Sequence, residues 1–97
     1  MATVKTRPYD PVDYLVTPED MAAYLEAALD DGEPKVIIAV LGDLARARGM
    51  TAVARGSGLG RESLYKALSP SGNPEFVTVM KVVRALGLRL HAVPASR

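Results

Sequence analysis

The fold of this chain is decided by Thr51-Ala-Val-Ala-Arg-Gly-Ser-Gly-Leu-Gly-Arg-Glu-Ser-Leu-Tyr-Lys-Ala-Leu68. Two short helices that meet at a steep angle need a small residue where they approach each other. They also need a residue that tolerates a positive φ in the turn, and an apolar residue that locks the second helix against the first. Ala54, Gly58 and Leu64 supply these in that order, at spacings of four and six residues. The stretch therefore predicts a helix-turn-helix over residues 51–68.

The outward face of the second helix follows from the inward position of Leu64, because each helical residue turns by about 100°. Its side chains are of the types that read base edges or hold phosphates. We predict DNA-binding side chains at seven positions: Thr51, Arg55, Arg61, Glu62, Ser63, Tyr65 and Lys66. Arg46 and Arg48, just upstream, are further candidates for phosphate contacts. Two alternatives stay open: the face is an ordinary solvated surface, and Tyr65 belongs to the core.

Two helices are expected before this stretch. Thr17 can cap the first one, with Pro18 at its first position, and Asp31-Gly32 ends it. Its apolar positions recur on one face at Met21, Tyr24, Leu25, Ala28 and Leu29. Pro34 can open the second helix, which runs to about Arg48. This helix is apolar around most of its circumference, and we therefore expect it to lie centrally in the core.

The two ends of the chain complete the predicted fold. A last helix is expected from Glu75 to Leu86, with an apolar face at Phe76, Val79, Met80, Val83 and Leu86. Residues Leu88 to Val93 alternate like a short strand, and residues 1–16, which include Pro8 and Pro11, should be extended or irregular. The predicted fold class is mostly α: an extended segment over 1–16, then one helical domain over 17–97 with five helices and a C-terminal strand.

Charge divides the chain into two unlike halves. Residues 1–34 carry two basic and eight acidic side chains, a net charge of −6, and residues 35–97 carry ten basic and three acidic ones, a net charge of +7. This asymmetry suggests that one part meets a polyanion and the other part meets a basic partner. The alternative is that the opposite charges merely neutralise each other within the fold.

Several classes of function are not expected. The chain has no cysteine and a single histidine, His91, so neither a disulfide nor a metal site is expected. The glycines between Gly56 and Gly60 lack the spacing of a nucleotide-binding loop. The apolar run Val36 to Leu41 is too short to cross a bilayer, and residues 1–11 lack a secretory pattern. We expect a cytoplasmic protein that is no enzyme, with no catalytic residue, no cofactor and no membrane contact.

Several stretches of the chain resemble the addiction-module antidote proteins, which are HigA-like antitoxins with an Xre/Cro-type DNA-binding domain. The resemblance lies in Gly49–Ser69, Gly72–Phe76 and Arg84–Leu90, with support from Tyr9–Leu15 and Gly42–Gly49. Its most specific part is Arg61-Glu-Ser-Leu-Tyr-Lys-Ala-Leu68. The resemblance therefore covers nearly the whole chain.

This resemblance implies a role and two partners. Such proteins neutralise a small toxin that resembles the RelE/HigB ribonucleases, and they repress the promoter shared with it, usually as dimers. It implies a recognition helix over Arg61–Leu68, with Arg61, Ser63, Tyr65 and Lys66 on operator DNA. The acidic first half would suit the basic surface of a ribonuclease. An unpaired strand over Leu88–Val93 would be a candidate dimer element.

The chain departs from the family pattern at two positions. Ala52 stands where many Xre-type domains have a DNA-contacting glutamine, and Gly60 stands where serine or threonine usually caps the recognition helix. Two other functions therefore stay open: a solitary Xre-type repressor without a toxin, and a toxin inhibitor that has lost DNA binding. The operator sequence and the particular toxin are not encoded in any visible motif.

Overall fold

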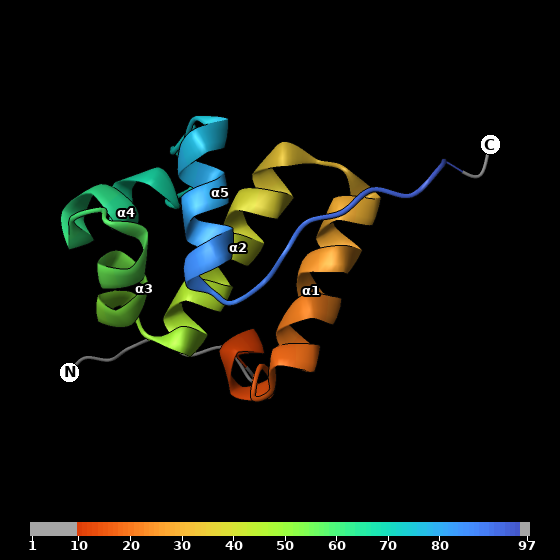
Figure 1. Ribbon diagram of the computed structural model, residues 1–97, viewed down its shortest axis with the longest axis horizontal. Coiled ribbons are helices and arrows are strands. Elements are labelled where there is room, and N and C mark those ends of the chain that lie inside the picture. Colours follow the sequence, from red (N-terminus) through yellow and green to blue (C-terminus); the bar gives the residue numbers. More distant parts are fainter. Residues whose placement is uncertain (1–9, 96–97) are drawn as a thin grey trace.

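The computed structural model describes residues 10–95, and five α-helices account for most of them (Figure 1). In chain order these are α1 (Pro18–Asp31), α2 (Pro34–Arg48), α3 (Met50–Ser57), α4 (Arg61–Ala67) and α5 (Phe76–Ala85). A short 3-10 helix, η1 (Pro11–Tyr14), precedes them. The prediction of a mostly α fold with five helices is therefore confirmed.

The start of α1 is held by a complete capping box. The Thr17 hydroxyl accepts a hydrogen bond from the Asp20 backbone N–H at 3.0 Å, and the Asp20 carboxylate accepts one from the Thr17 N–H at 3.0 Å. The hydrogen bond from the Thr17 backbone is the main reason why the pKa of Asp20 lies below its ordinary value. The box is therefore complete at neutral pH and weakens as the pH falls through the lowered pKa of Asp20.

Replacement of Thr17 by alanine is expected to lower the free energy of unfolding by about 1 kcal/mol, because the Asp20 N–H then loses its acceptor. Urea unfolding at neutral pH, followed by circular dichroism, measures this loss. Thr17→Ser keeps the hydroxyl and is the matched control. Equal stability of the alanine and serine variants would contradict the assigned role of the hydroxyl.

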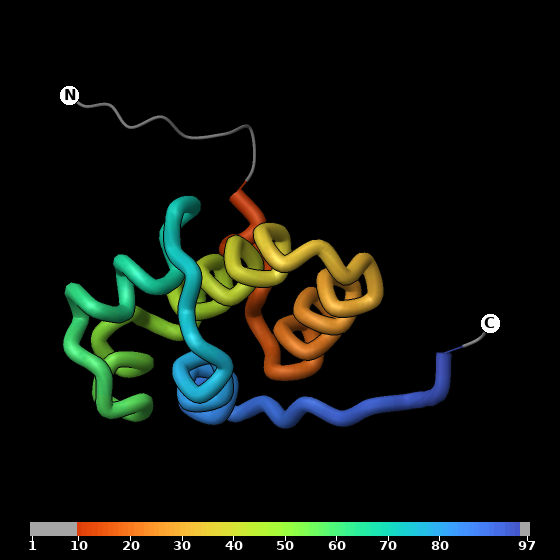
Figure 2. The backbone as a smooth tube through the Cα atoms, turned by 90° about the horizontal axis from the view of Figure 1, so that it is seen from above, coloured from red at the N-terminus to blue at the C-terminus, as the bar shows by residue number. Residues whose placement is uncertain are grey.

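Helix α2 lies at the centre of the molecule, as its apolar circumference predicts. It packs against η1, α1, α3 and α5, and the tube view shows it between α1 and the α3–α4 side (Figure 2). Leu41 and Leu44 on α2 are almost fully buried. They belong to one core cluster that draws residues from all five helices. The core thus holds α3 and α4 on one side of α2 and α1 on the other.

Polar contacts add to this packing on one side of α2. The Tyr24 hydroxyl of α1 donates to the Asp43 carboxylate of α2 at 2.7 Å. Arg46 forms ion pairs with Asp43 at 2.9 Å and with Asp10, just before η1, at 3.2 Å. Hydrogen bonds to Asp10 and then to Asp43 raise the pKa of Arg46. Arg46 therefore bridges two carboxylates. This structural role accounts for the arginine without the phosphate contact that was suggested for it.

The N-terminal segment, which was expected to be extended or irregular over residues 1–16, contains a short helix. Residues 1–9 lie outside the described residues, whereas Pro11–Tyr14 form η1. The Asp10 side chain caps η1 by accepting from the Val12 N–H at 3.1 Å. Leu15 then enters the core with 7% of its surface exposed. Proline disfavours an α-helix in this segment, but it is compatible with the short 3-10 helix η1. Leu15, directly after η1, is buried.

The predicted strand over Leu88–Val93 is wrong for the described chain. Gly87 ends α5 with a φ of 80°, and the residues after it run alongside α1 without forming a strand (Figures 1 and 2). A strand requires a neighbour that completes its ladder of hydrogen bonds, and no other strand exists among residues 10–95. The alternating apolar pattern of this segment instead reflects Leu88 and Leu90, which pack against the core.

Two side chains on the predicted apolar helix faces are exposed. Phe76 is 70% exposed, and Leu29 is 41% exposed. Phe76 begins α5, directly after the loop that follows α4, whereas Val82 and Val83 near the other end of α5 are buried against the core. Leu29 lies in the last turn of α1. Both side chains keep the correct helical period, but most of the Phe76 surface and much of the Leu29 surface stay in contact with solvent.

Candidate nucleic-acid interface

The predicted pair of short helices is present as α3 and α4, separated by a tight turn. Gly58 makes the turn with a φ of 77°, a left-handed conformation that side chains with a Cβ rarely adopt. Its N–H donates to the Ala54 carbonyl at 3.0 Å and so ends α3. The two helices are therefore separate elements and not one continuous rod.

Ser57 supports the same turn and was missed by sequence reasoning. It is buried, its hydroxyl donates to the Ala54 carbonyl at 3.2 Å, and it accepts from the Leu59 N–H at 3.3 Å. One hydroxyl thus satisfies a carbonyl of α3 and an N–H of the turn. A serine directly before a turn glycine is the available signal, because serine readily bonds backbone groups two residues away.

The inward side of the pair follows the predicted spacing. Leu64 of α4 has no exposed surface, and Ala54 of α3 is 6% exposed. Val53 of α3 and Leu68 at the end of α4 join them in the core cluster. Since Leu64 points inward, the orientation of α4 about its axis is set. Five other side chains of this short helix are exposed: Arg61, Glu62, Ser63, Tyr65 and Lys66.

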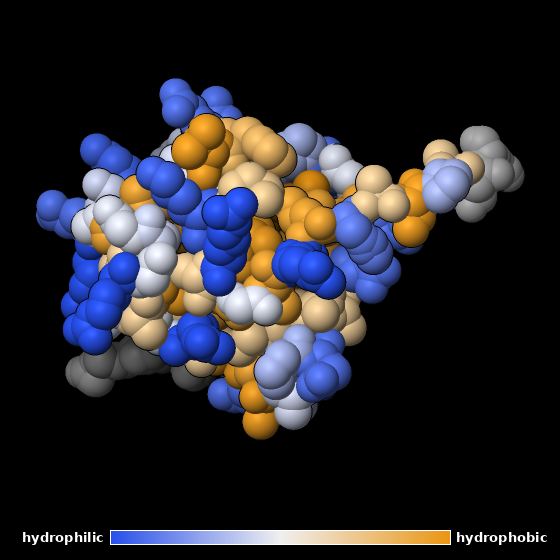
Figure 3. All heavy atoms as spheres, in the orientation of Figure 1, coloured by the Kyte–Doolittle hydropathy of each residue, from blue (hydrophilic) through white to orange (hydrophobic). Residues whose placement is uncertain are grey.

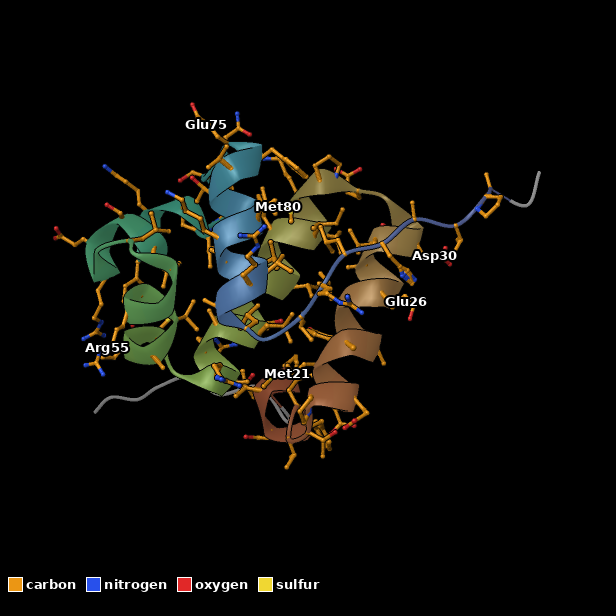
Figure 4. All side chains as sticks on the ribbon, in the orientation of Figure 1. Met21, Glu26, Asp30, Arg55, Glu75 and Met80 are labelled. Carbon is orange, nitrogen blue, oxygen red and sulfur yellow. The ribbon has the colours of Figure 1, made fainter. Side chains whose placement is uncertain are left out.

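The seven predicted DNA-binding side chains are all exposed: Thr51, Arg55, Arg61, Glu62, Ser63, Tyr65 and Lys66. Hydrophilic side chains cover the edge of the molecule formed by α3 and α4, at the left of the view (Figure 3). Arg55 projects from α3 away from the body of the protein (Figure 4). The structure thus brings these side chains to one exposed edge, with three basic groups among them.

Arg61 and Tyr65 interact one turn apart on α4. The Arg61 guanidinium donates to the Tyr65 hydroxyl at 3.3 Å, and its central carbon lies 5.6 Å from the centroid of the tyrosine ring. This geometry combines a hydrogen bond with a cation–π contact, worth about 0.5–1 kcal/mol at an exposed site. The guanidinium is therefore held along the outer face of α4.

For Tyr65 the sequence left two positions open, one on the DNA-facing surface and one in the core, and the structure shows features of both. It is 49% exposed on α4, yet it also lines a cavity of about 510 Å³ between α2 and the end of α4. Ile38, Met50 and Leu68 contribute apolar lining to the same cavity. One edge of the side chain therefore faces this partly apolar cavity, while its hydroxyl interacts with Arg61 at the surface.

Other kinds of site find no support in the described chain. Within residues 10–95, histidine and carboxylate side chains nowhere gather in a group of three that would hold a metal ion. None of the five α-helices described here has both the length and the apolar character needed to cross a bilayer. The Asp43 carboxylate is engaged by Tyr24 and Arg46. The exposed edge of α3 and α4 is the candidate site.

Comparison with known proteins assigns the chain to a family. Residues 5–94 match a family model described as "Probable addiction module antidote protein". The chain belongs to this antidote family. It is also 45% identical over 87 residues to an uncharacterized protein of Haemophilus influenzae, a match that covers 90% of each chain. No solved structure matches the chain.

Membership of the antidote family indicates an antitoxin role and, in general, a toxin as partner. The matched range includes all five helices. The family description does not name a toxin or a DNA site.

Proposed function

We propose that this antidote protein is the antitoxin of a type II toxin–antitoxin module and that it also represses its own promoter. In this proposal α3 and α4 form an Xre/Cro-type helix-turn-helix, and α4 enters the major groove of operator DNA. The observation that carries the proposal is the orientation of α4. Leu64 is buried, whereas Arg61, Ser63 and Lys66 are exposed to solvent.

The two departures from the family pattern are compatible with this role. Gly60 precedes α4 with a φ of −71° and offers no side-chain oxygen to the first turn, which costs a few tenths of a kcal/mol compared with serine. The helix nevertheless forms, since Leu64 anchors it in the core. Ala52 removes one contact, and Thr51 and Arg55 on the same helix remain exposed to supply others.

The proposed toxin is a small ribonuclease of the RelE/HigB type in the cytoplasm. A protein that binds RNA carries basic side chains on its surface, and α1 presents five acidic side chains and no basic ones. The charge asymmetry of the sequence thus has a counterpart in space, with acidic groups on α1 and basic groups along α3 and α4.

We further propose that the protein acts on DNA as a homodimer. Two copies related by a two-fold axis would contact half-sites about one helical turn, or roughly 10 bp, apart. Because Leu88–Val93 form no strand in the described chain, the exposed Phe76 and Val77 at the start of α5 are the better candidates for the subunit contact. They directly follow the loop after α4, so a contact there would bring two recognition helices close together.

One experiment tests the proposal and separates its alternatives. The chain is co-expressed with the small reading frame beside its gene, and copurification, growth and binding to the upstream DNA are measured. An antitoxin and autorepressor restores growth, copurifies with the toxin and binds the DNA, with an affinity that falls as salt rises by a log–log slope of about −0.9 per neutralised phosphate. DNA binding without a toxin partner would indicate a solitary repressor, and toxin binding without DNA binding would indicate a pure inhibitor.

A further inference from the structure

A groove separates α1 from the C-terminal segment, on the part of the molecule away from α3 and α4. Its volume is about 480 Å³, and Leu25, Leu29, Leu88, Leu90 and Val93 form its apolar lining. Both backbone views show residues 88–95 running alongside α1 (Figures 1 and 2). Leu29 is 41% exposed and Val93 is 76% exposed. The groove therefore presents aliphatic side chains from two segments to solvent.

The backbone beside this groove is unpaired. Leu88 donates its N–H to the Val83 carbonyl at 3.1 Å, but beyond it none of the backbone groups of residues 89–95 forms a hydrogen bond with the described chain. The segment is nevertheless laid out along α1 by Leu88 and Leu90, which pack against the core. An extended segment with free N–H and C=O groups is a template for strand addition by a partner.

Acidic side chains outnumber basic ones along the groove, two to one. Glu26 and Asp30 line it from α1, and both lie on the side of α1 that the C-terminal segment passes (Figure 4). Glu19, Asp20 and Asp31 bring the exposed acidic side chains of α1 to five. Arg89 has the opposite charge and lies on the C-terminal side of the groove. A partner with basic side chains fits this surface.

A second copy of the chain fits the same surface poorly. A two-fold contact places the same patch of both subunits face to face. Two α1 helices, each with five acidic and no basic side chains, would then approach each other. Like charges brought together in an interface oppose association, whereas a basic partner would gain from the same field.

We infer that this groove is the docking site for a basic, extended segment of the toxin. That segment pairs as a strand with residues 89–93, before Pro94. It places apolar side chains on Leu29 and Val93, and it directs its cationic side chains toward Glu26 and Asp30. The inference rests on the proposed antitoxin function and adds the surface that performs it. Because Arg55, Arg61 and Lys66 lie on the other side of α2, toxin docked here leaves the α3–α4 edge open to DNA.

The test measures the affinity of the full chain for a purified, catalytically inactive form of the protein encoded by the neighbouring reading frame. Leu29→Asp is expected to weaken binding about tenfold or more, because it places a charge in the apolar centre of the contact. Val36→Asp is the matched control, since Val36 on α2 is also 41% exposed and does not line the groove. Glu26→Lys should weaken binding at low salt and reduce its salt dependence, and Glu75→Lys, which makes the same change in charge elsewhere, should not.

The binding, oligomeric state and operator affinity of these variants distinguish four outcomes. Weaker toxin binding by the groove variants, with unchanged circular dichroism, oligomeric state and operator affinity, supports the inference. If the groove variants bind toxin as tightly as the parent chain, the docking site lies elsewhere and only the proposed function survives. If Leu29→Asp changes the oligomeric state instead, the occupant is a second copy and the inference is overturned. If the parent chain itself does not bind the toxin, the proposed function fails, and the inference fails with it.

Discussion

Leu64→Ala is expected to lower the free energy of unfolding by about 2–5 kcal/mol, the range for a leucine deleted from a packed core. Leu64 has no exposed surface and is the buried residue of α4, a helix of seven residues. A helix this short is not stable by itself in water and depends on tertiary packing. The variant should therefore lose both global stability and the order of α4, out of a total of about 5–15 kcal/mol for a typical domain.

The matched control removes the same atoms at the surface. Leu29→Ala makes an identical chemical change at a side chain that is 41% exposed, and its cost should be well below that of Leu64→Ala. Urea unfolding yields both free energies, and the operator affinity of each variant shows whether α4 is still formed. Equal costs for the two variants would mean that Leu64 does not anchor α4.

Arg61→Ala is expected to weaken binding to the operator by about 1–3 kcal/mol if the guanidinium reads a base. In the free protein this group already lies along α4, held by the Tyr65 hydroxyl at 3.3 Å. A side chain ordered before binding loses less conformational freedom on the DNA. Titrations of operator and unrelated DNA with both proteins, at one fixed salt concentration, measure the effect and its specificity.

Arg61→Lys distinguishes the two kinds of contact at this position. Lysine keeps the charge but lacks the planar pair of donors that matches guanine. If Arg61 reads a base, the lysine variant should lose nearly as much operator affinity as the alanine variant and little affinity for unrelated DNA. If lysine restores the affinity on both DNAs, Arg61 holds a phosphate. Full affinity of the alanine variant would place the DNA contact elsewhere.

The helices and the α3–α4 turn were predictable because their signals are local. Thr17 and Pro18 mark a helix start through groups within four residues, and Gly58 marks a turn through its own φ. The inward position of Leu64 follows from spacing along a single helix. Such features depend on residues that are close together in sequence, so they can be predicted from the sequence alone.

The errors lie where distant parts of the chain meet. Periodicity placed Phe76 on the apolar face of α5, but no element covers the start of that helix, and 70% of its surface stays exposed. Alternation suggested a strand after Leu88, but a strand depends on a partner that the described chain lacks. Nothing in the sequence pattern distinguished Arg46 from the neighbouring arginines. In the structure Arg46 forms an ion pair with Asp10 and so joins α2 to the segment before η1. Each of these outcomes depends on a residue far away in sequence.

The amino-acid sequence by itself determined the five helices, the turn at Gly58 and the face that α4 turns outward, because hydrogen bonds and steric limits within a few residues control them. Only the tertiary structure decided which apolar side chains stay exposed and which acidic groups gather beside them. Burial is a property of the assembled helices, since a side chain leaves water only when another element arrives to cover it. The groove between α1 and the C-terminal segment is the clearest case, because residues more than fifty positions apart in sequence form its two sides.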